Sequence, residues 1–304
     1  LPTFNIEVIS FMVDGFSVGQ IYEFSTLEFN NNITIEGILK VDELTIAPGF
    51  TLTASGSAAK IFANKVNGNL AVESQARVYV RELQGNLGVS TGSIDGAGFS
   101  PGIRTHVGEY NLEEGSTVEV EIDGPTPGTE YDQFQIDGKM KIETNTTLNI
   151  IVSANYGASI MSGTSFILAD VAGELEGDFT SMIWSGLDDS YYIVTSINSS
   201  NSGSSQLVAT IYEKPEIQGI TGDFVIDEAS SSLLNLELNN FDNKELVYRW
   251  QIINPVNIDS QKGATINNNE AIPSQAIFVA PDELGMGLDT LGFILRVSIE
   301  ESRV

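Results

Sequence analysis

Short runs in which apolar and polar residues alternate make up most of the chain, and they predict a protein built almost wholly of β-strands. Successive strand residues point to opposite faces of a sheet, so this alternation places the apolar side chains on one buried face. Gly, Asn, Asp and Ser separate the runs, and helical spacing is nearly absent. The clearest early runs are Ile33-Thr34-Ile35, Leu44-Thr45-Ile46, Phe50-Thr51-Leu52 and Val78-Tyr79-Val80.

Between residues 30 and 96 these runs are about three to five residues long and recur about every six to eleven residues, as in solenoid coils. Two segments, 65–72 and 82–89, share Gly-Asn-Leu, which begins at Gly68 and again at Gly85, 17 residues later. We therefore predict a β-solenoid, in which each strand pairs with its counterpart one coil further along. An antiparallel sandwich with tight hairpins is the alternative.

From Gly115 to Tyr212 the predicted strands lengthen, which suggests capping strands that close the solenoid. Pro215 then ends a strand, and the character of the sequence changes. We place a domain boundary there, between residues 1–214 and residues 215–304. The longer strands are expected at Thr117–Ile122, Tyr131–Ile136, Lys139–Glu143, Thr147–Val152, Ser165–Leu168, Tyr191–Ser196 and Gln206–Tyr212.

A glycine-punctuated turn that runs into an alternating strand, Pro127–Gly138, lies between Ser100-Pro101-Gly102 and the segment Gly163–Leu168. Together with Gly177-Asp178-Phe179, this order resembles the end of β-helical passenger regions in bacterial autotransporters and large adhesins, over about residues 96 to 212. The resemblance implies an all-β fold in which residues 1–214 form a right-handed β-solenoid. It also implies an elongated extracellular protein of the bacterial cell surface.

The last segment carries Trp250 within Val247–Ile252, followed by Ala276–Pro281 and Leu291–Ser298. A central Trp strand, a Phe-x-Ala-Pro strand and a late Phe-x-Leu-x-Val strand resemble an Ig-like module of the PKD or cadherin-like type. The resemblance implies that residues 215–304 form a β-sandwich, with the Trp between its two sheets.

The charge is strongly one-sided, with 41 acidic residues against 14 basic ones and a formal net charge of −27. Such a chain repels a phosphate backbone, so nucleic acid is excluded as a partner, and anionic membranes are disfavoured. No apolar run is long enough to insert into a membrane. The absence of cysteine excludes disulfides and thiolate chemistry.

Catalytic motifs are absent from the sequence, so we predict that the protein is not an enzyme and has no catalytic residues. The single histidine, His106, is expected to face solvent on a strand or turn. A polysaccharide lyase on a β-helix, with Arg77 or Arg81 as its base, is a weaker alternative, as is a hydrolase with paired carboxylates.

Calcium is the cofactor that the composition favours, because it binds carboxylate and carbonyl oxygens. Two acidic clusters are the predicted metal ligands, although ordinary solvated acids are the simpler explanation for them. The first cluster is Asp223, Asp227 and Glu228, and the second is Asp282, Glu283 and Asp289.

The predicted function is that of a non-enzymatic adhesin segment, which attaches to a glycan or protein on another surface. Exposed tyrosines would supply sugar platforms, and the candidates are Tyr110, Tyr131, Tyr191 and Tyr192. The alternative is a self-assembling subunit of a surface layer or filament, whose strand edges at 4–11 or 291–299 pair between copies.

Overall fold

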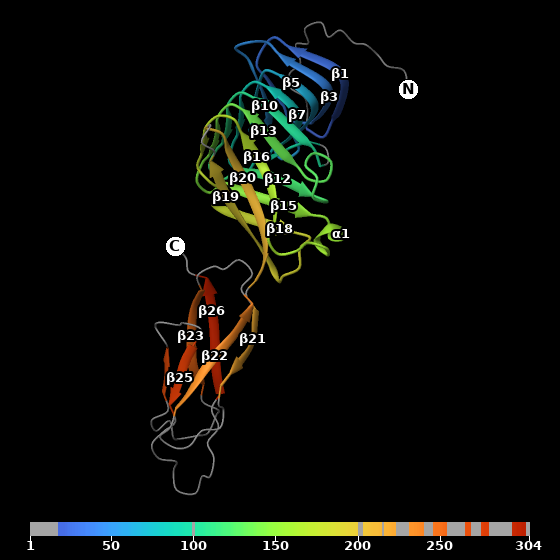
Figure 1. Cartoon of the computed structure of the whole chain (residues 1–304). Helices are drawn as coiled ribbons and strands as arrows, with labels where there is room; N and C mark the ends of the chain where they lie inside the picture. Colours follow the sequence, from blue (N-terminus) through green and yellow to red (C-terminus); the bar gives the residue numbers. More distant parts are fainter. Residues whose placement is uncertain are drawn as a thin grey trace. The chain divides into compact units, whose positions relative to one another are not determined.

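The chain divides into two compact units, Leu1–Tyr212 and Glu213–Val304, beside the boundary predicted at Pro215. In the described residues the only helix is α1 (Ala154–Gly157), so the all-β class predicted from the sequence is confirmed (Figure 1). The computed structural model describes residues 18–98, 101–199, 203–214, 216–222, 231–239, 246–253, 265–268, 275–279 and 294–301.

In the first unit the chain alternates between a large mixed sheet and a small parallel sheet. The thirteen strands of the large sheet are β1 (Ile21–Phe29), β3 (Ile38–Ile46), β5 (Lys60–Asn67), β7 (Arg77–Gln84), β9 (Ile94–Gly96), β10 (Ile103–Val107), β12 (Thr117–Ile122), β13 (Gln133–Asp137), β15 (Thr147–Val152), β16 (Thr164–Val171), β18 (Ser181–Ser185), β19 (Tyr191–Ser199) and β20 (Ser205–Glu213). The seven strands of the small sheet are β2 (Ile33–Ile35), β4 (Thr51–Ser55), β6 (Asn69–Glu73), β8 (Leu87–Val89), β11 (Tyr110–Leu112), β14 (Met140–Ile142) and β17 (Leu175–Glu176).

Strands of the small sheet pair in parallel and bring equivalent apolar residues into line. Ile33 pairs with Leu52, Leu52 with Leu70, Leu70 with Leu87, and Leu87 with Tyr110. All five are buried and belong to one hydrophobic core shared by the two sheets. Because β3, β5 and β7 also pair in parallel, the antiparallel hairpins considered for residues 30–96 are wrong.

Strands of the large sheet are longer than the sequence predicted in this region. β3 has nine residues, and β5 and β7 have eight each. Consecutive polar residues such as Asp42 and Glu43 interrupt the alternation and look like a break between two short strands. The backbone continues through them as one strand, and the buried positions resume at Leu44.

The large sheet divides at β7, a position that we call the branch point. On one side β7 pairs with β5 along its length. On the other side its first residues pair with β9 and its last residues with β10. Beyond β7 the sheet therefore continues as two branches, β9–β12–β15–β18 and β10–β13–β16–β20–β19 (Figure 1).

Glycines stack on one another at the turns that lead from the large sheet to the small sheet. A Cβ atom on Gly85 would overlap the carbonyl of Gly68, one on Gly108 would overlap Gly85, and one on Gly138 would overlap Gly108. Only glycine permits this approach, and Gly85 and Gly108 also have φ values of 150° and 136°. We call these residues the glycine column.

The second unit has two antiparallel sheets in its described residues. One contains β21 (Glu216–Thr221), β22 (Ser231–Asn239), β25 (Gln275–Val279) and β24 (Thr265–Asn268), in that order. The other pairs β23 (Leu246–Ile253) with β26 (Ile294–Glu301), and it places Trp250 opposite Val297. The Trp strand and the late Phe-x-Leu-x-Val strand singled out in the sequence are thus neighbours.

Candidate functional site

A hollow on the outer face of the large sheet, close to the branch point, is the candidate binding site. Its volume is about 190 Å³. We call it the aromatic groove. It is lined by Lys60, Phe62, Tyr79, Gly96, Ala97, Gly98, Glu119, Glu121 and Asp132.

The aromatic part of the groove is a stacked pair, Phe62 on β5 and Tyr79 on β7. These residues are register partners, and their ring centroids lie 5.2 Å apart with planes inclined by only 10°. Gly96 is the next residue in the same row, and a Cβ there would come within 2.7 Å of the Tyr79 ring. The missing side chain of Gly96 therefore makes room for the Tyr79 ring.

Glu119 follows Gly96 in this row and fixes the outer end of Tyr79. The Tyr79 hydroxyl donates to Glu119 Oε1 at 3.3 Å, and Asn149 Nδ2 donates to Glu119 Oε2 at 3.2 Å. Burial raises the pKa of Tyr79 above its usual value, although a hydrogen bond with Arg77 acts in the opposite direction. The phenol is therefore protonated at neutral pH, as its donation to Glu119 requires.

Asp132 closes the inner end of the groove and is only 4% exposed. Its Oδ1 accepts the Gly102 N–H and its Oδ2 accepts the Glu121 N–H, both at 2.8 Å. Burial raises the pKa of Asp132 to about 7, even though these two N–H groups lower it. The side chain thus joins the start of β10 to β12, one strand from each branch.

Glu121 is the remaining acid of the groove. Burial raises the pKa of its carboxyl, and the nearby Glu119 and Asp123 raise it further. Acidic side chains are therefore grouped at this end of the groove. Their carboxylate oxygens are acceptors for hydrogen bonds from hydroxyl groups.

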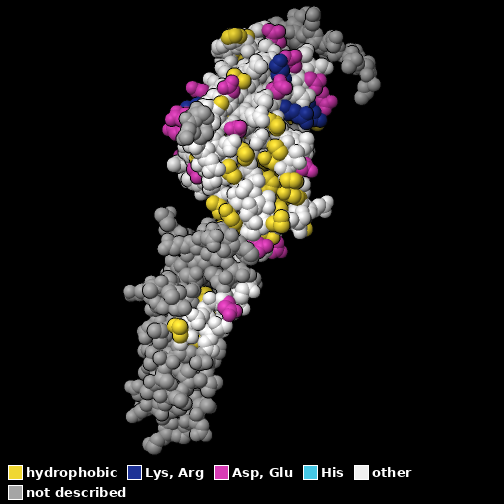
Figure 2. All heavy atoms as spheres, viewed as in Figure 1, with side chains coloured by type: hydrophobic (Ala, Val, Ile, Leu, Met, Phe, Trp, Pro, Cys, Tyr) yellow, Lys and Arg dark blue, Asp and Glu magenta, His cyan; other side chains and the backbone are white. Residues whose placement is uncertain are grey.

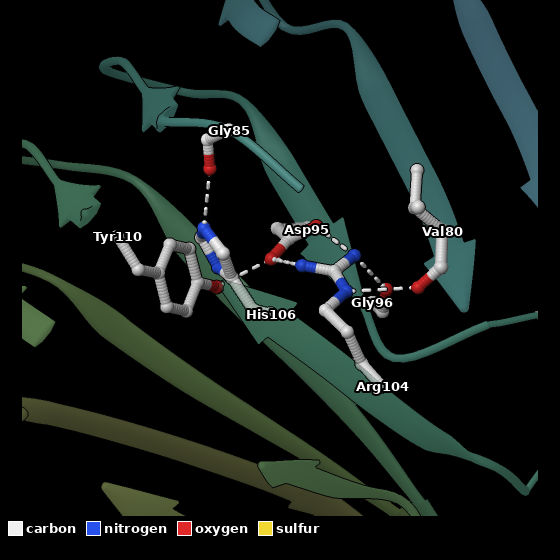
Figure 3. Close-up of polar contacts among 7 residues, drawn as sticks. All are labelled: Val80, Gly85, Asp95, Gly96, Arg104, His106 and Tyr110. Atoms are coloured by element: carbon white, nitrogen blue, oxygen red, sulfur yellow. Dashed lines mark hydrogen bonds and ion pairs between the residues drawn. The ribbon is translucent and has the colours of Figure 1, made fainter. Parts of the chain in front are cut away.

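A second polar cluster lies inside the core at the branch point (Figure 3). Arg104 on β10 donates to both oxygens of Asp95 on β9, at 2.5 and 2.6 Å, and neither side chain is exposed. Arg104 also donates to the carbonyls of Val80 and Gly96, at 2.8 and 2.5 Å. The Tyr110 hydroxyl donates to Asp95 as well. All three guanidinium nitrogens of Arg104 donate hydrogen bonds, and the cluster is closed to solvent, so its role is structural.

His106 belongs to this interior, and the prediction that it faces solvent is wrong. It is 1% exposed and its Nε2 lies 2.9 Å from the Gly85 carbonyl. Burial and the neighbouring Arg104 lower the pKa of His106 to about 4. In β10 the polar Arg104 and His106 point inward, while the apolar Val107 is 50% exposed on the outer face. This is the reverse of an ordinary strand, whose apolar side chains face the core and whose polar side chains face solvent.

Three of the four tyrosines predicted as sugar platforms are core residues instead. Tyr110, Tyr131 and Tyr192 are buried, and the half-buried Tyr191 packs against the core, where its hydroxyl donates to the Ile160 carbonyl at 3.1 Å. Sequence analysis missed Phe62 and Tyr79. A usable signal existed, because these two aromatics are 17 residues apart, the same separation as Gly68 and Gly85.

The six predicted calcium ligands all lie outside the described residues, so their clustering stays a prediction. They are Asp223, Asp227, Glu228, Asp282, Glu283 and Asp289. Within the described part of the chain, no three acidic or histidine side chains are grouped in a way that could hold a metal ion.

Comparisons with known proteins give no relative for this chain: no family model matches it, and no curated protein matches it either. In the described residues, no helix has the length and apolar character required to cross a membrane.

Proposed function

We propose that this chain is a non-enzymatic, adhesin-type segment of an extracellular bacterial surface protein, which binds glycans through the aromatic groove. The observation that carries the proposal is the stacked pair of Phe62 and Tyr79 in a hollow that also holds carboxylate acceptors. Pyranose rings have apolar C–H faces that rest on aromatic rings, and hydroxyl groups that donate to carboxylates. Apolar walls with a few placed polar groups are typical of ligand sites.

The proposed scaffold is a right-handed β-solenoid over residues 1–214, followed by an Ig-like sandwich over residues 215–304. The solenoid is supported by the regular alternation of the chain between two sheets and by the parallel register of equivalent residues. The sandwich is supported by the pairing of β23 with β26. A stacked core of this kind holds a binding face rigidly, as attachment requires.

Binding without turnover is supported by the way in which two of the groove's three carboxylates are engaged. Both oxygens of Asp132 accept backbone N–H groups, and both oxygens of Glu119 accept side-chain donors. A general acid or base has to exchange its proton with the substrate, and these contacts compete with that exchange. We therefore expect bound oligosaccharides to be recovered intact.

A glycan array with the purified chain tests the proposal. We expect saturable binding to a subset of glycans, and a loss of about tenfold or more in affinity for Phe62→Ala and Tyr79→Ala, since each ring contributes a large contact area. Trp184→Ala is the matched control, because Trp184 is a 37% exposed aromatic on β18, outside the groove. Equal binding by all four proteins would reject the groove as the glycan site.

Self-assembly is the second candidate function, and the free side of β18 favours it. In the described residues β18 pairs only with β15, and Ile183 on it is 52% exposed. Figure 2 shows hydrophobic side chains gathered over the part of the unit where β15 and β18 lie. Added strands pair readily with such an edge. Sedimentation velocity tests this candidate function. We expect polymers whose size grows with protein concentration, and we expect Ile183→Lys to abolish them. A monomer at every concentration would exclude assembly through β18.

A further inference from the structure

Lys60 and Arg77 are two neighbouring cations beside the aromatic groove. They are register partners on β5 and β7, in the row next to Phe62 and Tyr79. Lys60 also lines the groove. Like charges directly opposite one another on adjacent strands are destabilising, so this placement has an energetic cost.

The other basic side chains that the structure describes all have partners. Lys40 meets Glu23 at 2.8 Å and Lys65 meets Glu43 at 3.3 Å. Lys139, Lys141 and Arg104 form ion pairs, and Arg81 and Lys214 are engaged as well. Lys60 and Arg77 form no ion pair with a carboxylate of the described residues, although the chain has 41 acidic residues.

The aromatic groove therefore has two ends of opposite charge. The cationic end holds Lys60 and Arg77, the stacked rings lie beside them, and Glu119 and Glu121 follow beyond Gly96. A ligand that neutralises the cationic end must carry an anionic group. The carboxylates at the other end repel a second anionic group, which disfavours densely charged polyanions.

We propose that the groove selects an acidic sugar, a pyranose that bears one carboxylate. Its carboxylate contacts Lys60 and Arg77, its ring lies on the Phe62–Tyr79 pair, and its hydroxyl groups donate to Glu119 and Glu121. The inference rests on the proposed glycan-binding function and names the class of sugar. A neutral sugar would leave both cations unpaired, whereas a sugar acid supplies the charge-assisted hydrogen bonds that they lack.

Isothermal titration calorimetry on the full chain tests this selection. The probes are two disaccharides, each with a single galacturonic or glucuronic acid residue, and an oligosaccharide with a single sialic acid. Each probe is compared with its own methyl ester, which is uncharged. We expect at least one acid to bind about tenfold more tightly than its ester, because that is the gain in affinity that one charge-assisted hydrogen bond gives. Lys60→Gln leaves only Arg77 beside the groove and should reduce the preference for the acid, and the double variant Lys60→Gln with Arg77→Gln should make acid and ester bind equally.

Lys139→Gln is the matched control, since it removes one positive charge outside the groove, where Lys139 is paired with Glu174 and Glu176. It should keep the preference for the acid. If every acid and its ester bind equally to the natural chain while Phe62→Ala weakens both, the acidic-sugar inference is overturned and the glycan-binding proposal stands. If neither acids nor esters bind, and no neutral glycan on the array binds, both proposals fail.

Discussion

Arg104 and Asp95 form a fully buried, two-bond ion pair that joins β10 to β9 at the point where the large sheet divides. The two strands pair with different parts of β7, so the space between them has no backbone ladder of its own. The guanidinium fills it and satisfies the carbonyls of Val80 and Gly96. The ion pair thus replaces the sheet hydrogen bonds that are interrupted at the branch point.

Removing one member of this pair should be costly, because the other is left as an unpaired buried charge. We expect Arg104→Met to lower the free energy of unfolding by about 3–5 kcal/mol. The double variant Arg104→Met with Asp95→Leu should recover part of that loss. Urea unfolding measures all three proteins, and additive losses in the double variant would contradict the pairing.

The pH dependence of stability should show two opposing titrations. Asp132 has a folded pKa of about 7, above its ordinary 3.8, so its contribution is full at low pH and is lost as the pH rises through 7. His106 has a folded pKa of about 4, below 6.5, so its contribution is full above 6.5 and is lost as the pH falls to 4. The contribution amounts to about 4 kcal/mol for Asp132 and about 3 kcal/mol for His106 over their windows.

Single variants separate the two titrations. Relative to the natural chain, Asp132→Asn should lose stability more steeply as the pH falls from 6.5 to 4, since only the His106 loss remains. His106→Leu should instead gain stability over the same interval. Urea midpoints at four pH values between 4 and 7.5 measure this, and parallel curves for all three proteins would show that neither group titrates in this range.

The glycine column predicts a sharp contrast between two glycine substitutions. A Cβ atom on Gly108 would overlap the Gly85 carbonyl, whereas one on Gly56 meets nothing within 4 Å, and both glycines have positive φ. Gly56→Ala should cost only the backbone strain, about 1–2 kcal/mol, and Gly108→Ala should cost that strain plus the displacement of the turn at Gly85. Thermal unfolding compares them, and equal losses would mean that the column is not tightly stacked.

Calcium should act on the second unit if the predicted acidic clusters bind it. We expect millimolar Ca²⁺ to raise the unfolding temperature of the second unit and EDTA to reverse the rise, by mass action on the folded state. Asp227→Asn and Asp289→Asn should each reduce the shift. Glu113→Gln, a change in the first unit, is the control, and a shift that is the same in all variants would show non-specific screening.

Two strands after residue 115 were predictable to the residue because they keep strict alternation, whereas β18 (Ser181–Ser185), which is mostly exposed, was missed. Thr117–Ile122 and Thr147–Val152 were placed to the residue. The branch point was not predictable, since it arises from pairing between strands that are distant in sequence and from the inward Arg104 and His106, which break the alternation. The groove was hidden for a related reason. Phe62 and Tyr79 look like ordinary strand residues until the register places them side by side.

Between residues 69 and 132 the sequence separation of residues in contact increases, and this gives the folding of that region a direction. Asn86 contacts Asn69 over 17 residues, Glu109 contacts Asn86 over 23, and Gly102 contacts Asp132 over 30. Closing a longer loop costs more chain entropy, so within this region the contacts around Asn69 and Asn86 form at the lowest cost. We expect those turns to form first. The turns that close longer loops then form by pairing with strands that are already in place.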